Sequence, residues 1–114
     1  MWLHNGFMDA VFKALADRSR RRLLDLLYGA DGQTLTALCE QLDMSRQAVS
    51  KHLGILEGAG LISCLWTGRE KHHYLNPGPI EEIGTRWIDK YARRRLEALG
   101  ALRVALEHQE ETPS

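Results

Sequence analysis

The segment SRQAVSKHLGILEGAG, residues 45–60, constrains the fold of this chain more than any other. At about 100° per residue, its apolar residues Val49, Leu53 and Leu56 fall on one narrow helical face. Ser45 suits the N-cap position, because its hydroxyl can accept a hydrogen bond from a free backbone N–H of the first turn. The glycines at the other end suit a helix terminus. The segment therefore predicts an amphipathic helix with one side on a core.

The opposite face of this helix is polar and carries no acid. It presents Gln47, Lys51 and Gly54, flanked by Ser50. Gln and Ser side chains can hydrogen-bond to base edges in the DNA major groove, and Lys can reach phosphate or guanine. An ordinary surface helix would show the same pattern, so the segment alone leaves both interpretations open.

The residues on either side extend the pattern to a winged helix-turn-helix. Residues 34–42 predict a helix that leads through a short turn into residues 45–60, which is the spacing of a helix-turn-helix. Residues 61–66 and 71–76 predict two strands joined by a four-residue loop, 67–70. This hairpin would form a wing, with Arg69 at its tip close to the DNA backbone or minor groove.

The remaining helices complete a mainly α fold: five helices plus a two-stranded wing, in a single domain spanning residues 1–114. Helices are expected at about 7–16 and 18–28, and a long one at about 80–107. The apolar stripe of the long helix exceeds what a small domain can cover, which predicts a homodimer built on the first and last of these helices. The residues expected at its interface are Phe7, Val11, Ile83, Trp87, Tyr91 and Leu102.

Composition limits the compartment and the partners. With 114 residues, 44% hydrophobic and 26% charged, the chain has the composition of a soluble globular domain. It lacks the roughly 20-residue apolar run of a membrane span and a signal-peptide pattern. Its two cysteines are too few for a disulfide scaffold. We therefore expect a cytoplasmic protein without membrane contact.

The net charge of zero argues mildly against a nucleic-acid partner, but the charges are unevenly distributed. Residues 18–22, RSRRR, hold four arginines, and residues 45–73 carry a net charge of +2, whereas the tail from Glu97 carries −3. A neutral total can thus hide a basic face. Arginines 20–22 lie in the first turns of a predicted helix, where they could either cover apolar surface with their aliphatic stems or contact phosphate.

Three segments together resemble the ArsR/SmtB family of winged-helix repressors. They are FKALADRSRRRLLDLL at 12–27, LCEQLDMSRQAVSKHLGILEGAGLI at 38–62 and GREKHHYLNP at 68–77. The resemblance covers about residues 7–107. It implies a symmetric dimer that binds an inverted repeat in double-stranded DNA and is released by an effector, whose identity the sequence does not give. The residues expected to contact DNA are Ser45, Arg46, Gln47, Ser50, Lys51, His52, Arg69 and Lys71.

The metal sites of that family are not matched. Thr34 and Thr36 stand where arsenite sensors have a Cys-x-Cys pair, and hydroxyls are poor ligands for thiophilic metals. On the last helix, Tyr91 and Leu102 stand where the zinc-type site has histidines. The chain instead resembles the branch that does not sense metal, and we expect no metal and no cofactor.

The sequence also bears on three other functions. Cys64 and His73 would face each other across the hairpin and could form a non-standard metal or thiol switch, although two ligands are too few for a tight site. A winged helix that contacts protein instead of DNA is a second alternative, which a salt-dependent gel shift would distinguish. No nucleophile–base set or phosphate loop is present, so we expect no enzyme activity.

Overall fold

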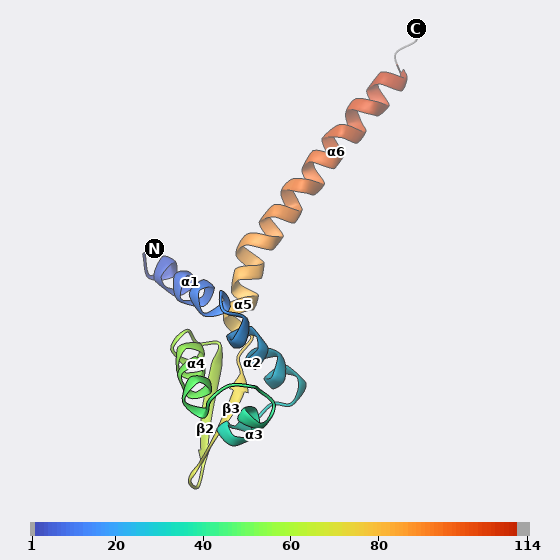
Figure 1. The fold of residues 1–114 in the computed structure, drawn as a ribbon. Helices are drawn as coiled ribbons and strands as arrows, with labels where there is room; N and C mark the ends of the chain where they lie inside the picture. Colours follow the sequence, from blue (N-terminus) through green and yellow to red (C-terminus); the bar gives the residue numbers. More distant parts are fainter. Residues whose placement is uncertain (1, 112–114) are drawn as a thin grey trace. The chain divides into compact units, whose positions relative to one another are not determined.

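The computed structural model describes the backbone of residues 2–111, and the side chains of residues 6–87 and 90–108 within that range. The chain divides into two compact units after Ile80. In chain order the elements in Figure 1 are α1 (Trp2–Leu15), α2 (Arg18–Gly29), β1 (Gln33–Thr34), α3 (Leu35–Glu40), α4 (Arg46–Gly58), β2 (Ile62–Thr67), β3 (Glu70–Leu75), α5 (Gly78–Ile83), the π-helical segment η1 (Gly84–Ile88) and α6 (Asp89–Glu111).

The first unit is built on leucines and valines at helical spacing. Asp17 is the N-cap of α2, and its carboxylate accepts hydrogen bonds from the backbone N–H groups of Ser19 (2.8 Å) and Arg20 (3.1 Å). These bonds, the one from Arg20 above all, hold the pKa of the Asp17 carboxyl below its usual value. The large, fully buried side chains are Val11, Leu23, Leu27, Leu38, Val49, Leu56 and Leu61. They come from α1 to α4 and the segment before β2, so these elements share one core.

The sheet has three antiparallel strands in the order β1-β3-β2. The predicted wing register is confirmed, because Cys64 pairs with His73 and Trp66 with Lys71. The predicted four-residue loop is wrong: Thr67 and Glu70 also pair, which leaves two loop residues. Gly68, the first of them, has a φ of 63°, which glycine adopts without strain.

The third strand, β1, was not predicted. Gln33 pairs with His73 and Thr34 with His72, so β1 adds a short edge to the wing. A strand of two residues has no alternation of apolar and polar side chains that a sequence could reveal. The mainly helical class and the winged helix-turn-helix are confirmed, but the sheet has three strands instead of two.

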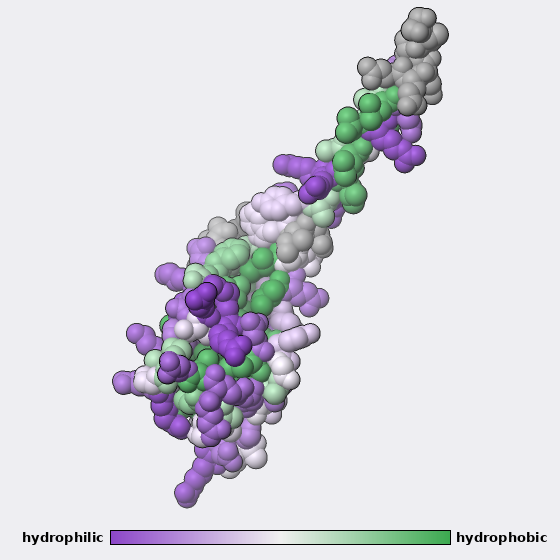
Figure 2. Space-filling model, turned by 45° about the vertical axis from the view of Figure 1, so that its right-hand side comes forward, coloured by the Kyte–Doolittle hydropathy of each residue, from purple (hydrophilic) through white to green (hydrophobic). Residues whose placement is uncertain are grey.

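The second unit is helical, as predicted for residues 80–107. α5, η1 and α6 follow one another without a break from Gly78 to Glu111. Every described side chain of α6 is exposed, including Leu96, Leu99, Leu102 and Leu106. Figure 2 shows apolar side chains gathered along this helix between charged ones. Among the described residues, no helix is long and apolar enough to cross a membrane.

Candidate nucleic-acid interface

The helix-turn-helix is formed by α3 and α4, and α4 is held by both its cap and its apolar face. The Ser45 hydroxyl accepts a hydrogen bond from the Ala48 N–H (3.1 Å), as the N-cap prediction requires. Val49, Leu53 and Leu56 are buried, as predicted. This packing fixes the rotation of α4 about its axis, so the opposite side chains must point outward.

The outward face of α4 carries the polar residues that the sequence predicted there. Gln47, Ser50 and Lys51 are exposed. Arg46 is exposed at the start of the helix, where its Nη1 donates to the Thr36 hydroxyl (3.1 Å) on α3. Such side chains can donate hydrogen bonds to phosphates and base edges, which is the chemistry that a major-groove helix needs.

The wing adds a cation beyond α4. Arg69 is exposed in the two-residue loop between β2 and β3. No hydrogen bond or ion pair fixes its guanidinium among the residues that the structure describes. It is therefore free to follow a phosphate backbone.

Two of the residues expected to contact DNA instead have partners within the chain. His52 is half-buried, and its Nδ1 lies 3.3 Å from Nη1 of Arg20 on α2. The Lys71 ammonium donates to the Glu57 carboxylate (3.1 Å) on the side of the wing that faces α4. Neither position excludes DNA contact, but both side chains already take part in packing the first unit.

The arginine run of α2 has a structural role that its sequence pattern does not predict. Arg20 donates from Nε to the Ala14 carbonyl (2.7 Å) and from Nη2 to the Lys13 carbonyl (2.9 Å). Arg21 donates to the Leu15 carbonyl (2.6 Å). These carbonyls end α1, where the last carbonyls of a helix lack i+4 donors. The Lys13 carbonyl also accepts from the Ala16 N–H (3.3 Å). The two arginines therefore cap the end of α1.

Structural hydroxyls occupy the two positions that correspond to the Cys-x-Cys pair of arsenite sensors. The Thr34 hydroxyl accepts from the Ala37 N–H (3.2 Å) and caps α3, while Thr36 accepts from Arg46. Among the described residues, no group of three or more His, Cys, Asp and Glu side chains is placed to hold a metal ion.

Cys64 and His73 face each other across the wing but are separately engaged. His73 is buried, and its Nδ1 lies 2.9 Å from the Gln33 carbonyl oxygen. Burial raises the pKa of the Cys64 thiol, and the charge of the nearby Glu57 carboxylate raises it further. A raised pKa leaves little thiolate at neutral pH, which makes this thiol less reactive than an exposed one.

The residues expected at a dimer interface differ in how much surface they offer. Val11 is fully buried in the core of its own unit and offers no exposed surface in one chain. Phe7 and Ile83 are partly exposed. Trp87, Tyr91 and Leu102 are exposed.

The comparisons with known proteins agree with this architecture. A helix-turn-helix domain family matches residues 15–64. The HTH-type transcriptional regulator YuzN of Bacillus subtilis is 37% identical over 91 residues, covering 75% of this chain and 99% of that protein. The arsenical resistance operon repressor of Escherichia coli is 34% identical over 92 residues, covering 81% and 78%. An ArsR-like transcriptional regulator from Rhodococcus sp. RHA1 has a TM-score of 0.74 at 28% identity, covering 95% of this chain and 97% of that one.

Proposed function

The chain belongs to the ArsR family of winged helix-turn-helix transcriptional regulators, and on this premise we propose that it is a homodimeric repressor that reads an inverted repeat through α4. The observation that carries the proposal is the polar outward face of α4, with Gln47, Ser50 and Lys51 exposed beside the capped N-terminus. The acid of this helix, Glu57, lies near its other end and is paired with Lys71. In a helix-turn-helix the second helix enters the major groove with its N-terminal residues against the base edges.

The proposed contacts divide into base readout and backbone positioning. Gln47 can make two hydrogen bonds to an adenine edge, whereas Ser50 and Lys51 can reach bases or phosphates. Ser45, Arg46 and the wing-tip Arg69 suit phosphate contacts, which set affinity and its salt dependence. We assign His52 and Lys71 at most secondary roles, because each already has a partner inside the first unit.

Substitutions at the two kinds of contact should differ in sequence dependence. Gln47→Ala should cost about 1–3 kcal/mol on a duplex selected by the protein and little on random DNA. Arg69→Ala should weaken both and lower the salt slope by about one unit. Arg103→Ala, which removes an exposed cation from the second unit, is the matched control and should change neither. Fluorescence anisotropy at several salt concentrations gives all three results.

Equal losses on selected and random DNA for Gln47→Ala would contradict base readout by this side chain. Absence of salt-dependent DNA binding in the wild-type chain would contradict the whole proposal. That outcome would favour a winged helix that contacts another protein.

The dimer is proposed to form through the apolar side of α6 together with α1. Leu99, Leu102 and Leu106 are exposed and spaced by three and four residues, which places them on one helical stripe beside Tyr91. Phe12 of α1 is also exposed and was not predicted. A helix with such a stripe gains stability by burying it against a second copy.

A pair of glutamate variants tests this interface. Light scattering should give about 26 kDa, twice the 13.0 kDa of one chain. Leu102→Glu should shift the mass toward the monomer, because it buries a charge in the stripe. Val104→Glu, an equally radical change at an exposed residue on the other side of α6, should leave the mass unchanged. A wild-type monomer at micromolar concentration would refute the dimer.

The proposed repressor does not respond to metal through the family's usual sites. Thr34 and Thr36 are engaged in capping and in the contact with Arg46, and their hydroxyls are poor ligands for soft metals. Without these metal ligands, we propose that DNA binding is regulated by an organic effector or by the amount of repressor that is made.

A further inference from the structure

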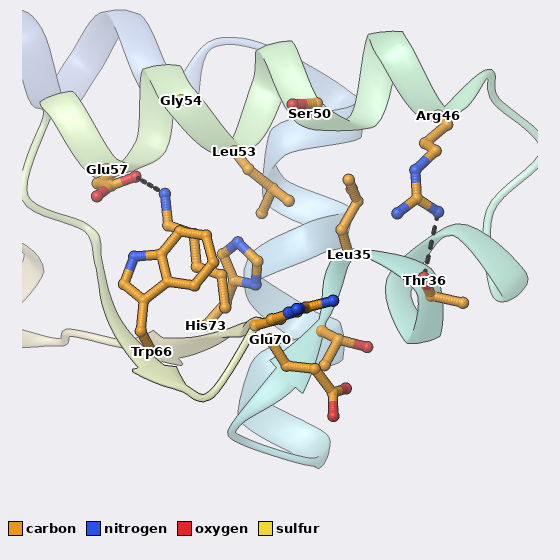
Figure 3. A pocket seen from close by; sticks show the side chains of 13 residues that line it. Leu35, Thr36, Arg46, Ser50, Leu53, Gly54, Glu57, Trp66, Glu70 and His73 are labelled. Atoms are coloured by element: carbon orange, nitrogen blue, oxygen red, sulfur yellow. Dashed lines mark hydrogen bonds and ion pairs between the residues drawn. The ribbon is translucent and has the colours of Figure 1, made fainter.

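A cleft of about 440 Å³ lies between α4 and the wing, within the first unit (Figure 3). We call it the wing cleft and define it by Leu35, Arg46, Leu53, Trp66, Arg69 and His73, which line it. Its volume falls in the range of about 300–1,000 Å³ that is typical of small-molecule sites. Its size alone does not say what it binds, but the chemistry of its walls does.

One wall of the wing cleft is apolar and aromatic. In Figure 3, Leu53 of α4 and Leu35 of α3 point into the same space as the indole of Trp66 from β2. Trp66 is 67% exposed, although it belongs to the side of the strand that faces α4. A large aromatic ring exposed beside leucines provides a flat surface on which a planar ring can stack.

A buried histidine at the cleft has an unused hydrogen-bonding atom. His73 is only 4% exposed, and its Nδ1 lies 2.9 Å from the Gln33 carbonyl oxygen. A carbonyl accepts only, so Nδ1 carries the proton and Nε2 of the neutral ring is an acceptor. Nε2 makes no hydrogen bond among the described residues. A ligand with an N–H or O–H group would satisfy it.

The charges at the cleft favour a singly charged anion. The Lys71 ammonium and the Glu57 carboxylate pair with each other at 3.1 Å, so they largely cancel. Arg46 uses Nη1 for the Thr36 hydroxyl and keeps its other N–H groups, while Arg69 is exposed. In Figure 3 the Glu70 carboxylate points away from the two leucines. Two arginines therefore remain for a carboxylate, which guanidinium groups bind in a planar, two-pronged geometry.

We propose that the wing cleft binds a small planar aromatic acid with an N–H or O–H group on its ring. The ring lies between Trp66 and the two leucines, the ring donor bonds to Nε2 of His73, and the carboxylate meets Arg46 and Arg69. A DNA phosphate would satisfy the two arginines, but it offers no ring for Trp66 and no donor for His73. The lining thus fits the acid better than the backbone of DNA.

Binding at this place has a consequence for DNA, which rests on the proposed function. Arg46 and Arg69 are also the residues that we assign to phosphate contacts. A ligand carboxylate on these arginines would neutralise them and occupy the space between α4 and the wing. The acid and DNA therefore compete, and the acid releases the repressor.

Calorimetry on the full chain without DNA tests the site itself, with indole-3-acetate as the probe and indole as its uncharged counterpart. We expect one acid per chain and at least tenfold weaker binding of indole. Trp66→Ala and His73→Asn should each weaken the acid at least tenfold. The asparagine amide can still donate to the Gln33 carbonyl but has no atom at the position of Nε2, so His73→Asn removes the proposed contact and keeps a donor for that carbonyl. Leu65→Ala, at a similarly exposed residue on the other face of β2, should change nothing.

Three results would overturn the site: no saturable heat with the acid, equal affinity for indole, or equal weakening by Leu65→Ala and Trp66→Ala. Circular dichroism melts of each variant identify any loss that comes from unfolding.

Fluorescence anisotropy with selected DNA then tests release. The acid should raise the wild-type concentration needed for half-saturation at least tenfold, and that of Trp66→Ala by less than twofold. Saturable binding without a change in DNA affinity would overturn the release step. If the wild-type chain binds no DNA even without the acid, the proposed function fails, and calorimetry still decides whether the wing cleft is a ligand site.

Discussion

Replacing Arg20 by alanine tests whether one side chain ties α1 to the rest of the first unit. Its guanidinium donates to the carbonyls of Lys13 and Ala14 at 2.9 and 2.7 Å, and Nη1 lies 3.3 Å from Nδ1 of His52 on α4. The side chain is only 14% exposed. Three elements, α1, α2 and α4, thus meet at this residue.

The expected loss follows from these contacts. A hydrogen bond to a charged group contributes about 1.5–3 kcal/mol when both atoms are shielded from water. Water can reach a helix end and replace part of each carbonyl bond, so we expect Arg20→Ala to lower the free energy of unfolding by about 2 kcal/mol in total. That is roughly a 30-fold change in the folding equilibrium constant.

Urea denaturation followed by circular dichroism measures this loss, with all variants at one protein concentration because association adds to apparent stability. Arg22→Ala, two residues along the same helix and exposed, is the matched control and should stay within about 0.5 kcal/mol of the wild type. Arg20→Lys should recover only part of the loss, because an ammonium lacks the guanidinium fork. The capping role would be refuted if Arg20→Ala and Arg22→Ala lowered the free energy of unfolding by the same small amount. If Arg20→Ala alone then also weakened DNA binding, a phosphate contact would be favoured.

Three further predictions concern caps, acid and metals. Ser45→Ala should lower the free energy of unfolding by about 1 kcal/mol, and Ser45→Asn should restore most of it in urea melts. Folding lowers the pKa of the Asp17 carboxyl, so the ionised carboxylate stabilises the folded state above pH 3.8. This stabilisation is lost as the pH falls through the lowered pKa of the folded state. Asp17→Asn should therefore make the loss of stability in acid less steep. Zinc, cadmium, nickel, copper and arsenite, titrated separately under reducing conditions, should not release bound DNA. Stoichiometric release at low micromolar concentration would restore Cys64 and His73 as ligands.

The features that the sequence predicts well are those set by local periodicity. The apolar residues of α4 recur at helical spacing, and the same three are buried. The wing register also follows from the sequence, because pairing Trp66 with Lys71 fixes every other pair in the hairpin. The two-residue turn was missed because the ends of the strands are polar and give no apolar signal.

The features that the sequence misses depend on contacts between distant segments. Arg20 reaches carbonyls six and seven residues before it, and a run of arginines gives no sign of which one does so. His52 lies between the outward and inward sides of α4, and its partner on α2 decides its direction. β1 exists because Gln33 and Thr34 meet β3, about 40 residues later. The wing cleft likewise combines α3, α4 and both wing strands, so no single motif reveals it.

Selection of bound duplexes from a random DNA pool, carried out with the wild-type chain and with Gln47→Ala, tests recognition of DNA through α4. A dimer that reads DNA through α4 should enrich an inverted repeat whose half-site centres lie about 10–10.5 base pairs apart, or a multiple of this. Gln47→Ala should retain the repeat and lose preference at one base pair in each half-site. Enrichment of no sequence by the wild-type chain, or an identical preference for both proteins, would contradict recognition through this helix.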